Sequence, residues 1–124
     1  MTQEEKDLLL KDLCARLPYG VKVRTTYISP KTKKRDDVGI DVLCAVGISM
    51  LIEGYEEHKP YLFPLSSMTE EQYNEYNNMG YSVTERGQSM ANYHQIDWFH
   101  KNHIDYRGLI PMGLAIDATG LNIY

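Results

Sequence analysis

Apolar residues near the start of the chain recur with the period of a helix. Leu9, Leu13 and the leucine four residues further on form one apolar stripe, and a proline follows directly. Thr2 and Glu5 have the spacing of a capping box, in which each side chain bonds a free backbone N–H group at the start of a helix. This pattern predicts a first helix over Thr2–Leu17.

The following apolar residues alternate with polar ones, which is typical of strands with one buried face. Val21–Ile28 and Val38–Val46 both show this alternation, and a polar, basic loop separates them. Ile48–Glu53 continues it as a third strand. Pro60–Pro64 is bounded by prolines, which favour a short edge strand because proline cannot donate a ladder hydrogen bond. The short connections predict an antiparallel meander of three or four strands.

Two further helices are predicted after the meander. Thr69 and Gln72 repeat the capping-box spacing, and a glycine ends the helix that they open. Asn92 caps the next helix, which ends near His103. Between the two helices, Tyr81–Ala91 has no period and is rich in small polar residues, so we expect an exposed loop there.

The end of the chain completes the expected fold. Glycines and prolines rule out further helix, so Leu109–Ile116 is expected to be a short strand or an extended strap. A chain of 124 residues with 43% apolar and 24% charged residues can form one core. The sequence therefore predicts a single α+β domain over residues 1–124, with the first helix and the Ile96–His103 helix covering the apolar face of the sheet.

The cellular compartment is predicted from the N-terminus, the apolar runs and the cysteines. The first residues lack the basic and apolar regions of a signal peptide, and the longest apolar-leaning run, Val42–Ile52, is too short to span a bilayer. Cys14 and Cys44 lie in apolar patterns without metal-ligand spacing, so we expect buried free thiols. We therefore expect a cytoplasmic, reduced protein with no membrane partner.

The charge is unevenly distributed along the chain. A formal net charge of −4 argues against a protein that coats nucleic acid non-specifically. One segment nevertheless holds seven basic residues and no acidic one, namely Arg16, Lys22, Arg24, Lys31, Lys33, Lys34 and Arg35. Two interpretations stay open for this basic segment: an edge that meets the phosphates of nucleic acid, or a solvated strand face with a charged loop.

The densest group of chemically active side chains follows the only tryptophan, Trp98. His103, Asp105 and Arg107 alternate, so an extended backbone would point all three the same way. They would combine a base, an orienting carboxylate and an anion-binding group, as in an acid–base enzyme acting on a phosphate-bearing or nucleic-acid substrate. In the structural alternative, Asp105 and Arg107 form an ion pair. Tyr106 then packs on Trp98 and ties the strap to the helix.

Histidines on the last predicted helix raise the question of a metal site. His100 and His103 are one helical turn apart, and His94 precedes them. Metal sites use such spacings with a third ligand such as Asp97 or Asp105. The chain has no HExxH motif and no second group of ligands, so we expect structural histidines, no metal and no cofactor.

The residues favour a small non-enzymatic interaction or regulatory module over an enzyme, because no nucleophile motif accompanies the histidine, aspartate and arginine. The expected partner is a protein, with nucleic acid as a second class that would bind through the basic segment. The candidate binding residues are Trp98, Tyr106, Arg107, Lys31, Lys33, Lys34 and Arg35.

Three blocks of the sequence carry a family resemblance. They are Glu5–Val21, Lys59–Glu71 and Asp97–Ala115, the last of which contains Asp-Tyr-Arg-Gly-Leu-Ile. Together they resemble a family of small proteins, without an assigned activity, that gut anaerobes carry, often on phages and other mobile elements. The resemblance covers nearly the whole chain outside Arg24–Glu57 and the expected loop. It implies an accessory protein that acts on a partner from the host or the element, and it implies no catalytic residues.

Overall fold

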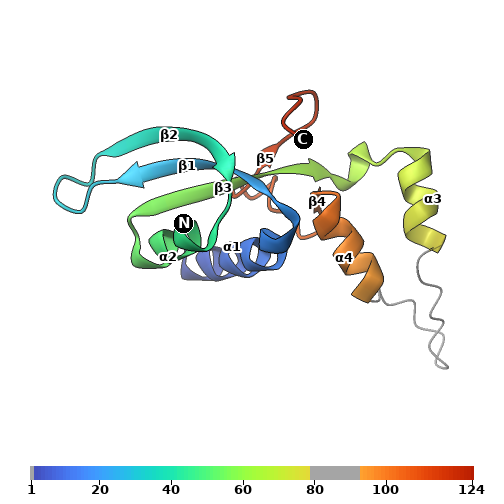
Figure 1. Ribbon diagram of the computed structural model, residues 1–124, viewed down its shortest axis with the longest axis horizontal. Coiled ribbons are helices and arrows are strands. Elements are labelled where there is room, and N and C mark those ends of the chain that lie inside the picture. Colours follow the sequence, from blue (N-terminus) through green and yellow to red (C-terminus); the bar gives the residue numbers. More distant parts are fainter. Residues whose placement is uncertain (1, 79–92) are drawn as a thin grey trace.

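The computed structural model describes residues 2–78 and 93–124, in which helices and strands build an α+β domain (Figure 1). In chain order the elements are α1 (Gln3–Arg16), η1 (Leu17–Tyr19), β1 (Lys22–Ile28), β2 (Arg35–Val42), α2 (Ala45–Glu53), β3 (Glu56–Pro64), η2 (Leu65–Ser67), α3 (Glu70–Asn78), α4 (Tyr93–Lys101), β4 (Ile104–Asp105) and β5 (Ile116–Asp117). The expected fold class and N-terminal helix are confirmed. The loop predicted at Tyr81–Ala91 and the cap predicted at Asn92 lie outside the described residues.

Local hydrogen bonds explain where α1 and α3 begin. The Thr2 hydroxyl accepts a hydrogen bond from the Glu5 backbone N–H at 3.1 Å. At α3 the Thr69 hydroxyl accepts from the Gln72 N–H at 3.2 Å, and the Gln72 side-chain oxygen accepts from the Thr69 N–H at 3.0 Å. The predicted helix starts are confirmed, because these bonds join residues three apart and need no tertiary contact.

The sheet is mixed and is not the expected antiparallel meander. Its strand order is β2-β1-β3-β4, and β5 also pairs with β3. β1 is antiparallel to both β2 and β3, whereas β4 and β5 are parallel to β3. The meander prediction is wrong because α2 intervenes between β2 and β3, so that β3 joins the sheet on the far side of β1 from β2.

The predicted third strand, Ile48–Glu53, is part of α2. Alternation alone cannot distinguish a short apolar strand from a helix. This part of the sequence also has the period of a helix, because Leu43, Gly47 and Leu51 recur every four residues and are all buried. Gly54 then ends the helix in the left-handed conformation, with φ of 84°.

β3 is a central strand of nine residues, not the short edge strand expected at Pro60–Pro64. Pro60 lies opposite Val23 of β1, whereas pairing with β5 begins at Tyr61. No described strand pairs with Pro60 on the β5 side. Although proline has no N–H group, the sheet therefore lacks no ladder hydrogen bond there.

Two groups of buried apolar side chains hold the helices to the sheet. α1 and α2 lie on the same face of the sheet (Figure 1). The larger group packs between these helices, β1 and β3, and its buried members are Leu9, Leu13, Val21, Val23, Leu43, Leu51, Leu62, Leu109, Leu114 and Ala115. The smaller group joins α4 to the end of β3, and its buried members are Trp98, Phe99 and Ile104.

Trp98 is a buried anchor, with only 3% of its surface exposed. Its ring lies 5.9 Å from the rings of Tyr76 and Phe99, measured between centroids. Tyr106 stacks on Phe99 at 5.2 Å, so the expectation that it packs on Trp98 is wrong. The reason is that neighbouring residues on a helix point in different directions, so that Phe99, whose ring also lies 4.8 Å from that of Tyr76 on α3, is the residue that Tyr106 reaches.

Three smaller expectations meet different outcomes. Cys14 and Cys44 are free thiols, but both are exposed, so their predicted burial is wrong. Cys44 is exposed because it occupies the N-cap of α2 and no strand interior.

The segment predicted as a strap, Leu109–Ile116, consists mostly of turns before β5. No helix in the described part of the chain is long and apolar enough to cross a bilayer.

The packing of Trp98 gives a stability prediction. Trp98→Ala should lower the free energy of unfolding by about 3–5 kcal/mol, because it removes a large side chain from a closed core. The control is Tyr73→Ala, which truncates an aromatic residue that is 58% exposed on α3 and should change stability by about 0.5 kcal/mol or less. Urea unfolding measures both variants. Equal midpoints would show that Trp98 is no core residue.

Candidate functional site

His103, Asp105 and Arg107 do not share one face, as an extended backbone would require. His103 has φ of 58°, in the left-handed region, so the backbone turns before β4. The two carboxylate oxygens of Asp105 accept hydrogen bonds from the backbone N–H groups of Leu109 and Ile110, both at 2.9 Å. The predicted ion pair between Asp105 and Arg107 is therefore wrong, because both carboxylate oxygens of Asp105 bond the backbone of the turn that follows β4.

Arg107 pairs instead with a residue of α1. Its Nε donates to Asp12 at 3.0 Å, and Arg16 Nε donates to the other oxygen of the same carboxylate at 2.8 Å. Arg16 also donates to the backbone oxygen of Ile104 at 2.6 Å and to that of Phe99 at 3.5 Å. Asp12 and Arg16 are both fully buried. These contacts lock α1 to the end of α4 and to β4, so they have a structural role.

His103, the first member of the predicted trio, lines a pocket. This pocket has a volume of about 380 Å³, and the His103 ring stacks on Tyr124 with 3.7 Å between centroids. Burial lowers the pKa of His103 to about 4, with smaller contributions from the charges of Arg16 and Lys22. Its buried Nδ1 has no hydrogen-bond partner in the described part of the chain. Among the described residues no carboxylate bonds this imidazole, and Asp105 bonds the backbone of Leu109 and Ile110 instead, so the pairing of His103 with Asp105 that the acid–base hypothesis needs is not formed.

The histidines of α4 form no metal site in the described residues, which contain no cluster of three His, Cys, Asp or Glu side chains suited to a metal ion. His100 Nε2 lies 2.7 Å from the Tyr106 hydroxyl, and the two share a hydrogen bond. Burial is the largest cause that lowers the pKa of His100. His100 therefore serves the packing of Tyr106.

Much of the basic segment is neutralised within the fold. Arg24 forms an ion pair with Asp37 across the β1–β2 hairpin, and Arg35 pairs with Glu57 at 2.7 Å. Arg16 is buried. Within the basic segment, the exposed basic residues without an ion pair to a described residue are three lysines at the tip of the hairpin, Lys31, Lys33 and Lys34. The basic surface is thus smaller than the sequence implies.

An exposed apolar surface lies on β2, which is an edge strand of the sheet. Three of its residues, Val38, Ile40 and Val42, are 63%, 48% and 48% exposed. We call these three residues the apolar edge. Ile40 pairs with Arg24 and Val42 with Lys22, so both side chains lie on the outer face of the sheet, away from α1 and α2. A β-bulge near Val38 interrupts the register.

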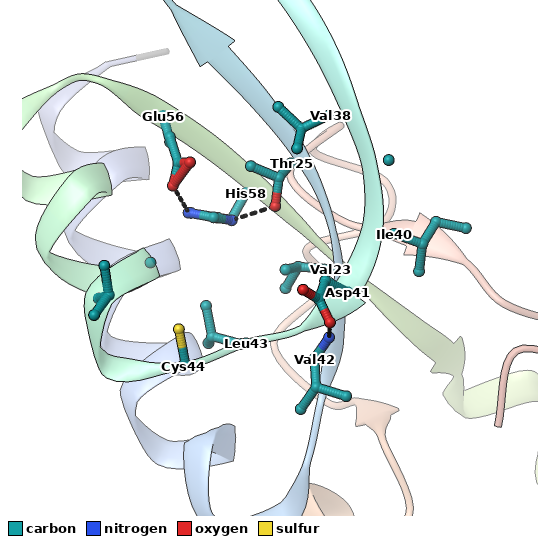
Figure 2. Close-up of a pocket in the computed structure, with 13 residues that line it drawn as sticks. Val23, Thr25, Val38, Ile40, Asp41, Val42, Leu43, Cys44, Glu56 and His58 are labelled. Carbon is teal, nitrogen blue, oxygen red and sulfur yellow. Dashed lines mark hydrogen bonds and ion pairs between the residues drawn. The ribbon is translucent and has the colours of Figure 1, made fainter.

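The inner face of β2 forms one wall of a groove of about 260 Å³, which Figure 2 shows. We call it the β2 groove. It is lined by Val23, Thr25, Val38, Gly39, Ile40, Asp41, Val42, Leu43, Cys44, Val46, Gly47, Glu56 and His58. Asp41 points toward Val23 on the inner side of β2, whereas Ile40 points away from it (Figure 2). The lining contains two carboxylates and no lysine or arginine.

His58 is a buried polar residue of the β2 groove, with 3% of its surface exposed. Its Nδ1 shares a hydrogen bond of 2.9 Å with the Thr25 hydroxyl (Figure 2). Its Nε2 lies 3.4 Å from a carboxylate oxygen of Glu56, and no hydrogen bond joins these two atoms. The ring packs on Gly47, where an added Cβ would lie 3.3 Å from it. The His58 ring is therefore positioned by contacts with Thr25, Glu56 and Gly47.

The sequence alone did not point to Asp41, Glu56 or His58. The alternation in Val38–Val46 predicts a buried face that includes Ile40 and Val42, whereas both side chains lie on the outer face of an edge strand and Leu43 is buried instead. The available signal was the density of acids on this strand, since Asp36, Asp37 and Asp41 fall within six residues.

Comparison with known proteins adds no further information, since no family model, no curated protein and no solved structure matches this chain. The site is therefore argued from its own geometry.

The buried carboxylate of Asp12 gives a second stability prediction. Asp12→Ala should cost about 3–5 kcal/mol, because it leaves Arg16 buried and unpaired. Arg107→Ala should cost less, about 1–3 kcal/mol, because Asp12 keeps Arg16 as its partner. Chemical denaturation of the single and double variants measures the coupling energy. We expect coupling of about 1–3 kcal/mol for Asp12 with Arg107. A larger coupling of Asp105 with Arg107 would contradict this assignment.

The lowered pKa of His103 predicts a pH dependence. The unfolded chain binds a proton on this histidine near pH 6.5, whereas the folded protein does so only near pH 4. Since the unfolded state binds more protons between these values, stability should fall as the pH is lowered from about 6.5 to about 4. His103→Asn tolerates the left-handed backbone and should reduce this slope in thermal unfolding. An unchanged slope would show that other groups cause it.

Proposed function

We propose that this protein is a non-enzymatic interaction module whose β2 strand binds an extended segment of a partner protein. The observation that carries this proposal is the apolar edge. Its side chains are exposed on a strand that, within the described residues, pairs with a neighbour on one side only. Extended peptides bind such edges through main-chain hydrogen bonds, and side-chain contacts add specificity.

The charges of β2 favour a different chain over a second copy of this one. Natural sheets protect their edges with bulges and charged residues, and β2 has both. If two copies paired antiparallel about Gly39, Asp37 of each would lie opposite Asp41 of the other. Like charges directly opposite one another destabilise a strand pair. These features suppress self-association while leaving the edge open to a chain of other charge.

The partner segment that fits best is basic and apolar. β2 carries three aspartates, of which Asp37 pairs with Arg24 of β1, whereas Asp36 and Asp41 form no ion pair in the described residues. Its one cation, Arg35, already pairs with Glu57 of β3. A segment containing lysine or arginine therefore complements the strand, and charge complementarity selects partners and speeds association. Apolar residues of the same segment would cover Ile40 and Val42.

Nucleic acid is the weaker of the two partner classes. Lys31, Lys33 and Lys34 project at the hairpin tip, but the arginines of the basic segment are engaged in internal ion pairs. Three lysines can neutralise only a few phosphates, which limits the affinity for nucleic acid at physiological salt. The acid–base hypothesis lacks a supporting observation, because Asp105 and Arg107 are engaged elsewhere.

The biological setting of the proposal comes from the family resemblance of the sequence. An accessory protein of a phage or mobile element would act by binding a host or element protein. A small domain with an edge strand for peptide addition suits that role, because it needs no catalytic residues.

The proposal is tested by capture of partners from a lysate of a gut anaerobe with three baits. They are the unaltered protein, Ile40→Lys, and the control Leu121→Lys, whose residue is 50% exposed in the C-terminal segment. Ile40→Lys places a charge in the apolar edge and repels a basic segment, so it should lower capture about tenfold or more. Leu121→Lys should leave capture unchanged.

The captured protein must also be located on the strand. A photoreactive residue at position 38 should crosslink to an extended segment that contains lysine or arginine. Equal capture by all three baits, a crosslink to a folded acidic surface, or loss of capture after nuclease treatment would each contradict the proposal. The last result would favour nucleic acid at the hairpin tip.

A further inference from the structure

We infer that the β2 groove is a specificity pocket that receives a lysine or arginine side chain of the segment bound along β2. This inference rests on the proposed function and names the side chain that the partner contributes. It concerns the inner face of the strand, whereas the apolar edge includes side chains of the outer face.

The alternation of strands places a partner side chain over the groove. In a strand added beside β2, successive side chains would point to opposite faces of the sheet. Those on the outer face would lie beside Ile40 and Val42. Those on the inner face would lie beside Gly39 and Asp41, whose cross-strand partners Thr25 and Val23 both line the groove. A segment bound at the edge therefore aims every second side chain at the groove.

The groove presents acceptors to whatever enters it. The Glu56 carboxylate accepts no hydrogen bond in the described residues, and its side chain is 19% exposed. Asp41 uses one oxygen to accept from the Val42 N–H at 2.7 Å, which leaves the other oxygen open. Neither carboxylate forms an ion pair with a lysine or arginine in the part of the chain that is described.

His58 supplies an independent sign that a donor belongs in the groove. Its Nδ1 is bonded to Thr25, and its buried Nε2 has no hydrogen-bond partner in the described residues. A buried polar atom without a partner is costly, and native proteins rarely leave one. With the proton on Nδ1, Nε2 is an acceptor that lies 3.4 Å from an oxygen of Glu56. One donor-rich cationic group can therefore satisfy both residues.

The walls of the groove suit the stem of a basic side chain. Val23, Leu43 and Val46 are apolar and line the groove together with its carboxylates. Lysine and arginine bury their methylene stems on apolar surface while the charged head reaches polar groups. An anionic side chain would meet two carboxylates and no cation. A neutral apolar side chain would leave Glu56 and His58 without donors.

The test compares two peptides on the whole protein. One is acetyl-Ser-Val-Arg-Val-Arg-Val-Ser-amide, and in the other citrulline replaces both arginines, which keeps the shape and removes the charge. Affinity is measured by titration with detection of backbone amide resonances, including those of Gly39 and Gly47. We expect the arginine peptide to bind about tenfold more tightly. Its resonance changes should be centred on β2 and the first turn of α2.

Three variants assign the preference to the groove. Glu56→Gln and Asp41→Asn keep the shape of each side chain and should lower the preference for arginine, and the double variant should abolish it. Glu75→Gln, an exposed acid on α3, removes the same charge away from the groove and should leave the preference unchanged. A preference that Glu75→Gln reduces equally would reflect net charge alone and would overturn the inference.

The outcomes separate this inference from the proposed function. Equal binding of both peptides at β2 overturns the specificity pocket and leaves edge binding intact. Absence of binding by either peptide also overturns the pocket, while capture that depends on Ile40 would still support the interaction module. Binding of the arginine peptide away from β2 contradicts both.

Discussion

The fold depends on one buried carboxylate, that of Asp12, which lies between the guanidinium groups of Arg16 and Arg107. Burying a charge is costly unless it is paired and hydrogen-bonded, and Asp12 meets both conditions. Arg16 extends the contact to backbone oxygens of α4 and β4, some eighty residues further along the chain. The N-terminal helix, the last helix and the parallel strand β4 are thus fixed together. The strand held in this way, β4, pairs with β3 on the side away from β1.

The parts of the fold that were predictable from sequence are those fixed by short-range bonds. The starts of α1 and α3 depend on side chains three residues apart, and β1 shows the alternation of a half-buried strand. The Asp12–Arg16 contact was not predictable, because a spacing of four residues on a helix is typical of exposed pairs. Only partners far along the chain, Phe99, Ile104 and Arg107, show that it is buried.

The candidate site could not be predicted, because it depends on where the chain goes after β2. Ile48–Glu53 fits both a strand and a helix, and α2 rather than another strand follows β2. That choice carries β3 to the far side of β1, exposes Ile40 and Val42, and brings His58 against Gly47. The prediction that His103, Asp105 and Arg107 point the same way was wrong for a related reason. The left-handed backbone at His103 turns the chain out of the extended conformation.

The central claim, that β2 receives a partner strand, is tested most directly by hydrogen exchange of its backbone amides. Amides on the open side of an edge strand exchange readily, and strand addition gives them hydrogen-bond partners. In complex with the captured partner, amides within Val38–Val42 should exchange at least tenfold more slowly. Those of the hairpin tip, Lys31–Lys34, should not change. Protection confined to the tip, or unchanged exchange along β2, would contradict the account.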